Sequence, residues 1–219
     1  MTEPLALTYY SDVLCVWAHI AQPRIDEVGE HFTDTVAIDY RLCSVFGDTA
    51  HKIGVGWAGR GGYAGFAQHL HEVVAGFDHV TLHPDIWQRN APVSSTPAHL
   101  LIKAVQRVDK RQCRAVLQAL RVAFFERCLD ISKRSVLIDT LEAVGVPVDA
   151  VQAQIDNGMA FADLEADRRE QQLLMVQGSP TIILNEGRQK LYGNIGYKVI
   201  EANIRELLRS PVAGAASWC

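Results

Sequence analysis

The chain has 219 residues, of which 48% are hydrophobic and 21% charged, which is enough apolar material for one globular core with an insertion. Its net charge of −4 gives no reason to expect a nucleic-acid or membrane partner, and no apolar run approaches the roughly 20 residues of a membrane span. Met1 leads almost directly into a strand without a secretory signal, and the five cysteines show no close pairing. We therefore expect reduced thiols in the cytoplasm.

Cys15 lies where a predicted strand meets a predicted helix. Residues 5–10 form a short apolar run, and apolar residues between 20 and 32 recur at roughly helical spacing. Free backbone N–H groups and the positive end of the helix dipole are directed at such a position and stabilise a thiolate. We expect the pKa of Cys15 to fall from about 8.5 into the range of roughly 3.5–7.5, which makes this thiol a nucleophile at neutral pH.

The next stretch contains a second strand and a glycine-rich segment. Residues 36–42 alternate as a strand does, and they predict a parallel pair with the first strand. The G-x-G-x-x-G match at residues 54–59 does not directly follow a strand, so we interpret residues 47–65 as a mobile loop over a cleft rather than a dinucleotide site. The histidines at positions 69, 71, 79 and 83 match no zinc spacing, so we expect no metal.

From residue 96 onward the pattern is mostly helical. Helices are predicted at residues 96–108, 113–128, 132–144, 149–155 and 160–176. Cys113 and Cys128 belong to one apolar helical stripe, so we interpret both as packing residues. A hairpin of residues 181–184 and 189–192, a final helix at 198–208 and a loose tail at 210–219 complete the prediction.

Two motifs resemble the signatures of the thioredoxin superfamily. Cys15 is followed eight residues later by Pro23, as in the Cys-x-x-Cys active-site turn with its helix-kinking proline. The sequence Gly-Ser-Pro-Thr at 178–181 resembles the Gly-x-Pro-Thr signature, whose proline is cis and lies against the nucleophilic cysteine. The turn departs from the family because Ala18 replaces the second cysteine.

The order of the elements is similar to that of DsbA-like proteins. The resemblance implies an α/β, thioredoxin-like fold with an inserted all-helical domain: a first half at residues 1–47, the insertion with its glycine-rich loop at 48–159, and a second half at 160–209. The first motif looks most like the cytoplasmic FrnE-like branch. It is also similar to kappa-class glutathione transferases and 2-hydroxychromene-2-carboxylate isomerases, which carry Ser where Cys15 stands.

The resemblance implies three alternative functions. In a monothiol oxidoreductase, the Cys15 thiolate attacks a disulfide, and an external thiol such as glutathione then releases it because Ala18 cannot. In a transferase or isomerase, the site binds glutathione, whose thiolate attacks a small aromatic electrophile. A binding module without chemistry is the third alternative. No bound cofactor is expected, the expected partners are small thiols or disulfide-containing peptides and proteins, and a homodimer is left open.

The resemblance also assigns residues to the site. The active-site turn comprises Val16, Trp17, Ala18 and His19 around the catalytic Cys15, and the thiol substrate is expected to meet Ser179, Pro180, Thr181 and Asn194. The backbone of Ser179 is expected to pair with an extended substrate, and Asn194 to reach the γ-glutamyl end of glutathione.

Three further expectations concern residues near the turn. Trp17, Trp57 and Phe46 are expected to form an apolar pocket for an aromatic substrate. His19 either tunes Cys15 as a base or cation or faces solvent. Cys43, at the end of the second strand, either resolves the mixed disulfide or packs into a helix–sheet interface, which we favour.

Overall fold

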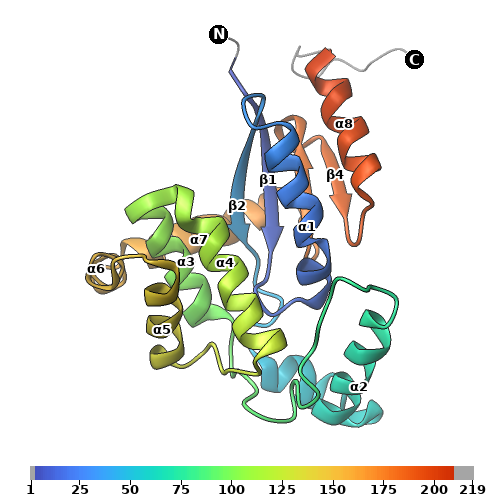
Figure 1. Cartoon of the computed structure of the whole chain (residues 1–219), viewed down its shortest axis with the longest axis vertical. Coiled ribbons are helices and arrows are strands. Elements are labelled where there is room, and N and C mark those ends of the chain that lie inside the picture. The colour runs from blue at the N-terminus through green and yellow to red at the C-terminus, as the bar shows by residue number, and fades with distance from the viewer. Residues whose placement is uncertain (1–2, 210–219) are drawn as a thin grey trace.

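A computed structural model describes residues 3–209 of the chain, and its centre is a four-stranded mixed sheet (Figure 1). The strands are β1 (Leu5–Ser11), β2 (Val36–Leu42), β3 (Thr181–Leu184) and β4 (Gln189–Tyr192), in the order β2-β1-β3-β4. β1 pairs parallel with β2 and antiparallel with β3, which pairs antiparallel with β4. The predicted parallel pair and the predicted hairpin are both confirmed.

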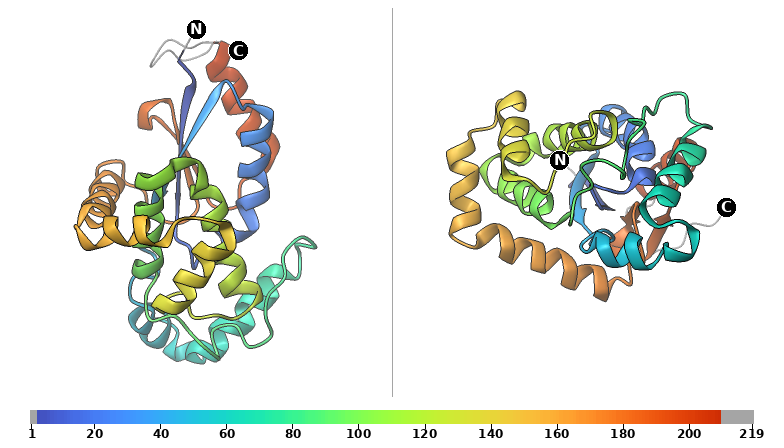
Figure 2. Two further views of the ribbon diagram at one scale, coloured as in Figure 1. Left: turned by 60° about the vertical axis from the view of Figure 1, so that its left-hand side comes forward. Right: turned by 90° about the horizontal axis from the view of Figure 1, so that it is seen from below.

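Helices cover both faces of this sheet. α1 (Val16–His31), which contains Pro23, and α8 (Tyr197–Arg209) lie on one side, and α7 (Met159–Leu173) lies on the other (Figure 2). Because side chains alternate along a strand, Tyr9 on β1 joins the main core with α1, whereas Tyr10 joins a smaller cluster on the α7 side. The strand that precedes Cys15 is therefore buried from both faces.

The stretch between β2 and α7 is mostly helical, as predicted from residue 96 onward. It contains α2 (Gly62–Val74), α3 (Thr96–Asp109), α4 (Cys113–Arg121), α5 (Arg134–Val144) and α6 (Val148–Asp156), with short helical turns at Ala50–Val55, Ala58–Arg60, Lys110–Gln112 and Val122–Glu126, and another later at Asn185–Gly187. Cys113 is buried in the main core, as interpreted. Cys128 is also buried, but it lies beyond the helical turn with a φ of +52°, and its thiol donates to the carbonyl oxygen of Arg89 at 2.9 Å, so the single helical stripe that was to join the two cysteines is wrong. No helix among residues 3–209 has the length and apolar character needed to cross a bilayer.

The prediction of a mobile loop at residues 47–65 is wrong. Most of the segment from Ala50 to Val74 is helical, and α2 begins inside the predicted loop, at Gly62. Gly61 has a φ of +88° and lets the chain turn between two helical pieces. At Gly65 a side chain would collide with the carbonyl oxygen of Arg60, 1.7 Å from an added Cβ. These two glycines allow a tight turn into α2. The glycine-rich pattern of the sequence does not by itself distinguish such a turn from a flexible loop.

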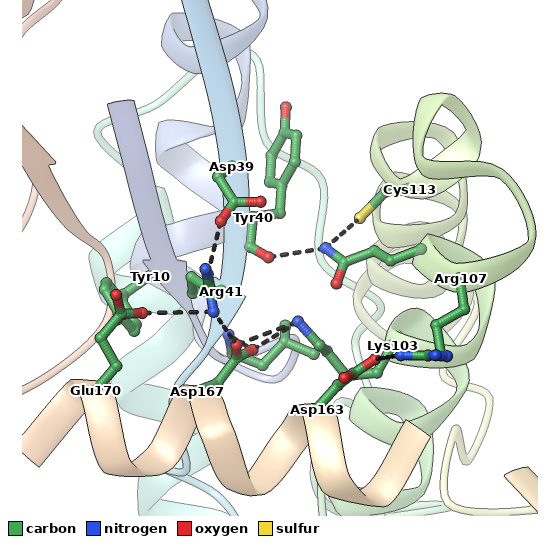
Figure 3. Close-up of polar contacts among 12 residues, drawn as sticks. Tyr10, Asp39, Tyr40, Arg41, Lys103, Arg107, Cys113, Asp163, Asp167 and Glu170 are labelled. Atoms are coloured by element: carbon green, nitrogen blue, oxygen red, sulfur yellow. Dashed lines mark hydrogen bonds and ion pairs between the residues drawn. The ribbon is translucent and has the colours of Figure 1, made fainter. Parts of the chain in front are cut away.

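A buried polar network fastens the helices to the sheet (Figure 3). The carboxylate of Asp167 on α7 pairs with Arg41 of β2 at 2.9 Å and with Lys103 of α3 at 3.0 Å, and it accepts the backbone N–H of Leu42 at 3.0 Å. Gln106 of α3 donates to the carbonyl oxygen of Tyr40 at 2.8 Å. Through these contacts α3 and α7 hold the end of β2 that leads toward the site. The predicted tail at residues 210–219, with Cys219, lies outside the described residues.

Candidate active site

Cys15 is the N-cap residue of α1, which confirms its predicted position. Its backbone is extended, with φ −83° and ψ 115°, and its carbonyl oxygen accepts the N–H groups of Ala18 and His19, each at 3.1 Å. The N–H of Cys15 itself donates to the carbonyl oxygen of Asp12 at 3.1 Å. The turn from Asp12 to Cys15 is therefore closed by its own backbone, and the thiol stands at the start of the helix.

The second motif lies directly against the first. The peptide bond between Ser179 and Pro180 is cis, and β3 begins at Thr181. The Cys15 thiol donates to the carbonyl oxygen of Ser179 at 3.2 Å, and the Ser179 hydroxyl accepts the N–H of Asp12 at 2.9 Å. Thr181 Oγ1 donates to the carbonyl oxygen of Gly178 at 2.8 Å. The structure thus brings Cys15, Ser179 and Pro180 together, as the resemblance implied.

Asp12 organises the turn, a role that sequence reasoning did not assign to it. Its Oδ1 accepts the N–H of Leu14 at 2.9 Å, and its Oδ2 accepts the N–H groups of Val45 and Phe46 and the Ser95 hydroxyl at 2.8–2.9 Å. The Asp12–Leu14 contact is an Asx turn, the local signal by which the residue could have been found. The contacts with residues 45, 46 and 95 had no such signal.

The Asp12 carboxyl is fully buried and yet ionised. Burial opposes the charge, but a nearby His99 ring and the N–H groups of Phe46 and Leu14 outweigh it and lower the pKa of Asp12 below its ordinary value of 3.8. His99 Nε2 lies 3.6 Å from Oδ1 of Asp12 and 3.2 Å from the N–H nitrogen of Val13. A fixed negative charge therefore lies three residues before Cys15.

The expectation of a low pKa for Cys15 is wrong for this arrangement. The residue is 5% exposed, and burial raises the pKa of its thiol above the ordinary value of 9.0. Hydrogen bonds from Ser179, Ala18 and Trp17 act in the opposite direction, and the charge of Asp12 adds to the rise. The helix start does favour the thiolate, but desolvation is the larger effect, and the sequence does not reveal how deeply the sulfur is buried.

Cys43 packs as we favoured, behind the site. It is fully buried against Tyr10, Val176 and Ile183, and burial raises its pKa well above the ordinary thiol value. The charges of Asp12 and Cys15 add to that rise, so Cys43 lies within electrostatic range of both. All four cysteines in the described part of the chain are free thiols. A resolving role for Cys43 stays an untested prediction.

His19 is a neutral side chain in this site, so the cationic role is wrong. Its ring stacks on Phe125, with centroids 4.7 Å apart and planes 11° apart. Burial lowers the pKa of His19 to about 4, and the charges of Arg121 and His79 contribute to the decrease. An imidazole with so low a pKa is also a poor general base at neutral pH.

The predicted apolar pocket of Trp17, Trp57 and Phe46 does not form. Phe46 is buried between Phe66 and Trp87, and Trp57 packs edge-on against Phe66, with ring centroids 5.0 Å apart. Trp17 is 36% exposed and meets Phe77 edge-on at 6.2 Å. The aromatic side chains pack into the helical region, an outcome that depends on tertiary contacts beyond the motif.

Asn194 lies next to the second motif, and its side chain bonds to α1. The N–H of its neighbour Gly193 donates to the carbonyl oxygen of Pro180 at 2.9 Å, whereas Asn194 Oδ1 accepts a hydrogen bond from Arg24. Arg24 is nine residues beyond Cys15, more than two turns along α1. The binding role expected of Asn194 has no support from this contact.

A family model described as the DSBA-like thioredoxin domain matches residues 6–205. The chain belongs to this DsbA-like family. The match confirms the α/β, thioredoxin-like fold that the two motifs predicted. No curated protein sequence matches the chain closely enough to count as a relative.

Solved structures of DsbA-like proteins have the same fold. A proposed protein disulfide isomerase from Nitrosomonas europaea has a TM-score of 0.79 at 14% identity, over 95% of this chain and 99% of the other. The cytosolic disulfide reductase DsbM from Pseudomonas aeruginosa, with glutathione, gives 0.69 at 19% identity, over 95% and 99%. A 2-hydroxychromene-2-carboxylate isomerase gives 0.66 at 15% identity, over 97% and 100%. At these identities the likeness establishes the shared fold.

Proposed function

We propose that this DsbA-like protein is a monothiol thiol–disulfide oxidoreductase that uses Cys15 as its nucleophile and glutathione as co-substrate. The observation that carries the proposal is the contact between the Cys15 thiol and the Ser179 carbonyl oxygen, 3.2 Å apart at the start of α1. Ala18 occupies the position of a resolving cysteine, one helical turn from Cys15. The substrates we propose are glutathione mixed disulfides of peptides or proteins, in a reducing compartment such as the cytoplasm.

The proposed reaction has two exchange steps. The Cys15 thiolate attacks one sulfur of a disulfide, a Cys15–glutathione bond forms, and the other sulfur leaves as a thiolate. A second glutathione thiolate then attacks the glutathione sulfur of the mixed disulfide, releasing glutathione disulfide and the Cys15 thiolate. Electrons balance because each turnover breaks one disulfide, that of the substrate, and forms one, glutathione disulfide, with the consumption of one free glutathione.

The buried thiol needs a trigger to ionise, and the Ser179 carbonyl oxygen supplies one in this proposal. In the free protein, that oxygen accepts the thiol hydrogen of Cys15. An extended substrate that pairs with the backbone of Ser179 competes for the same oxygen and frees the thiol. The N–H groups of Trp17 and Ala18, which already favour the thiolate, then stabilise the ionised sulfur.

Intact mass spectrometry tests this function. We expect the reduced protein, incubated with glutathione disulfide, to gain one glutathione on Cys15 and to lose it again when free glutathione is added. Cys15→Ser must abolish the adduct at that position. Cys43→Ser is the matched control, since Cys43 is a buried thiol near the site, and it must leave the adduct unchanged. If Cys15 stays unmodified while the protein is folded, the oxidoreductase proposal fails.

One observation favours a second candidate, a glutathione-dependent transferase or isomerase. The Cys15 thiol is protonated and donates a hydrogen bond, so it offers to a glutathione thiolate the donor that a serine hydroxyl would offer. Under this candidate Cys15→Ser keeps its activity toward a small electrophile. Tight glutathione binding without a covalent adduct, equal in the parent and in Cys15→Ser, would favour it over the exchange mechanism.

A further inference from the structure

Arg121, the last residue of α4, is a fully buried arginine without an acidic partner. Its side chain is 0% exposed, and no carboxylate among residues 3–209 lies within ion-pair distance of it. Nη1 donates to Gln22 Oε1 on α1, and Nη2 donates to Ser11 Oγ on β1 at 3.0 Å. Both acceptors are neutral, so the charge is hydrogen-bonded but uncompensated.

The surroundings of Arg121 contain further polar atoms without partners. Among the described residues, buried atoms that lack a hydrogen bond include Arg121 Nε, Tyr9 Oη and His19 Nε2. Arg121 is close enough to Tyr9 and His19 to influence the pKa of each. Buried polar atoms are nearly always satisfied, so a concentration of exceptions at one place calls for a functional reason.

This cluster lies between the two elements that flank the nucleophile, β1 and α1. Ser11 comes four residues before Cys15 and Gln22 seven residues after it, so Arg121 links the strand that enters the active-site turn to the helix that leaves it. The Tyr9 hydroxyl is within electrostatic range of both Arg121 and Cys15. A buried cation costs several kcal/mol unless something offsets it, and an anion that forms during the reaction offsets it only then.

We propose that Arg121 is the positioning residue of the Cys15 site: it holds α1 against β1, and its uncompensated buried charge stabilises the Cys15 thiolate when that thiolate forms. The inference rests on the proposed use of Cys15 as a nucleophile. It gives the helical region between β2 and α7 a part in the chemistry, because α4 carries the charge.

Other titratable groups are linked to Arg121 or Cys15, directly or through one neighbour: Tyr9, Asp12, His19, Cys43, His79 and His99. Asp12 is the fixed anion among them and opposes ionisation of Cys15. His19 is neutral near pH 7 and carries no opposing charge.

Site-resolved alkylation of Cys15 against pH tests the inference. Arg121→Met removes the charge and keeps much of the apolar stem, and we expect the midpoint of the Cys15 profile to rise by about half a pH unit or more. Arg121→Lys, which keeps a cation, is expected to stay closer to the parent. Arg114→Met is the matched control: Arg114 is on the same helix, but it is partly exposed and pairs with Asp26 at 3.2 Å. Equal midpoints for Arg121→Met and Arg114→Met would overturn the inference.

A second pair of variants covers the case in which Arg121→Met does not fold. Gln22→Glu places a carboxylate where Arg121 already has an acceptor, and Gln22→Met removes that acceptor without adding charge. Both lose the hydrogen bond from Gln22 to Asp26, so the difference between them isolates the charge. We expect a higher Cys15 midpoint in Gln22→Glu than in Gln22→Met, and equal midpoints would contradict the inference. Alkylation requires no disulfide exchange, so this result is independent of the glutathione adduct that tests the function.

Discussion

The Cys15 thiol and the Ser179 carbonyl oxygen lie 3.2 Å apart although 164 residues separate them along the chain. Cys15 follows β1, and Ser179 lies two residues before the start of β3, which pairs antiparallel with β1. The sheet therefore builds the contact, and neither motif forms the site by itself.

Ala18→Cys should convert the site into a dithiol site. Residue 18 is one helical turn from Cys15, and its N–H already donates to the Cys15 carbonyl oxygen. We expect the two sulfurs to reach disulfide geometry and to form an intramolecular disulfide in mild oxidant, which the loss of two free thiols in a mass-labelling assay would measure. Ala21→Cys is the control, since it lies a further turn along the same buried face. Two free thiols in oxidised Ala18→Cys would show that the turn is built differently.

Asp12→Asn should destabilise the fold. The carboxylate accepts hydrogen bonds at both oxygens, and an amide must turn an NH₂ group toward donors that have no other partner. We expect a loss of about 2–4 kcal/mol in the free energy of unfolding, measured in urea. Asp109→Asn, at an exposed site beside Arg111, should have little effect. Equal stability of the two variants would contradict the role given to Asp12.

The low pKa of His19 predicts that the folded protein loses stability in mild acid. Its pKa is about 4 in the folded protein and about 6.5 when unfolded, so between these values the unfolded chain binds a proton that the folded chain does not. Stability is thus fully present above pH 6.5 and falls toward pH 4, by up to roughly 3 kcal/mol. Urea titrations at several pH values should show that His19→Phe lacks this part of the slope. His31→Phe, at an exposed position, should keep it, and an unchanged slope in His19→Phe would refute the assignment.

Asp167→Asn tests the network of Figure 3. The neutral side chain leaves Arg41 and Lys103 without their shared anion, and Lys103 is itself buried. We expect a destabilisation of about 3–5 kcal/mol by urea unfolding, since removing one partner strands a buried charge. Asp163→Asn, which breaks the partly exposed pair with Arg107, is the comparison and should cost less than about 1 kcal/mol. A reversed order would show that this network does not hold the helices.

The fold was predictable because the informative patterns are local. Each informative pattern occupies a short stretch of sequence. Examples are the alternation in residues 36–42, the glycine and proline that follow the helix ending at Val144, and the two thioredoxin-like motifs. They placed Cys15 at the N-cap of α1 and Ser179 beside it. Family resemblance supplied the rest of the architecture.

The electrostatics of the site were not predictable from the same patterns. The helix start indicated an acidic thiol, but the pKa of Cys15 depends on burial and on Asp12, and burial is set by the packing of distant segments. No local sequence motif marks Arg121, because its hydrogen-bond partners on β1 and α1 are about 100 residues away in the chain. The aromatic pocket expected of Trp17, Trp57 and Phe46 failed because each ring packs on another partner. Trp17 meets Phe77 and Phe46 meets Trp87, both far along the chain, whereas Trp57 meets the nearby Phe66.

The steady-state kinetics of mixed-disulfide reduction test the central claim most directly. A glutathionylated peptide would serve as substrate with glutathione as reductant, using the parent, Cys15→Ser and Cys43→Ser. We predict ping-pong kinetics for the parent, seen as parallel double-reciprocal plots, because the Cys15–glutathione adduct is an obligatory intermediate. Cys15→Ser should be inactive, and Cys43→Ser should match the parent. Activity that survives in Cys15→Ser, or that is lost in a folded Cys43→Ser, would contradict a monothiol mechanism at Cys15.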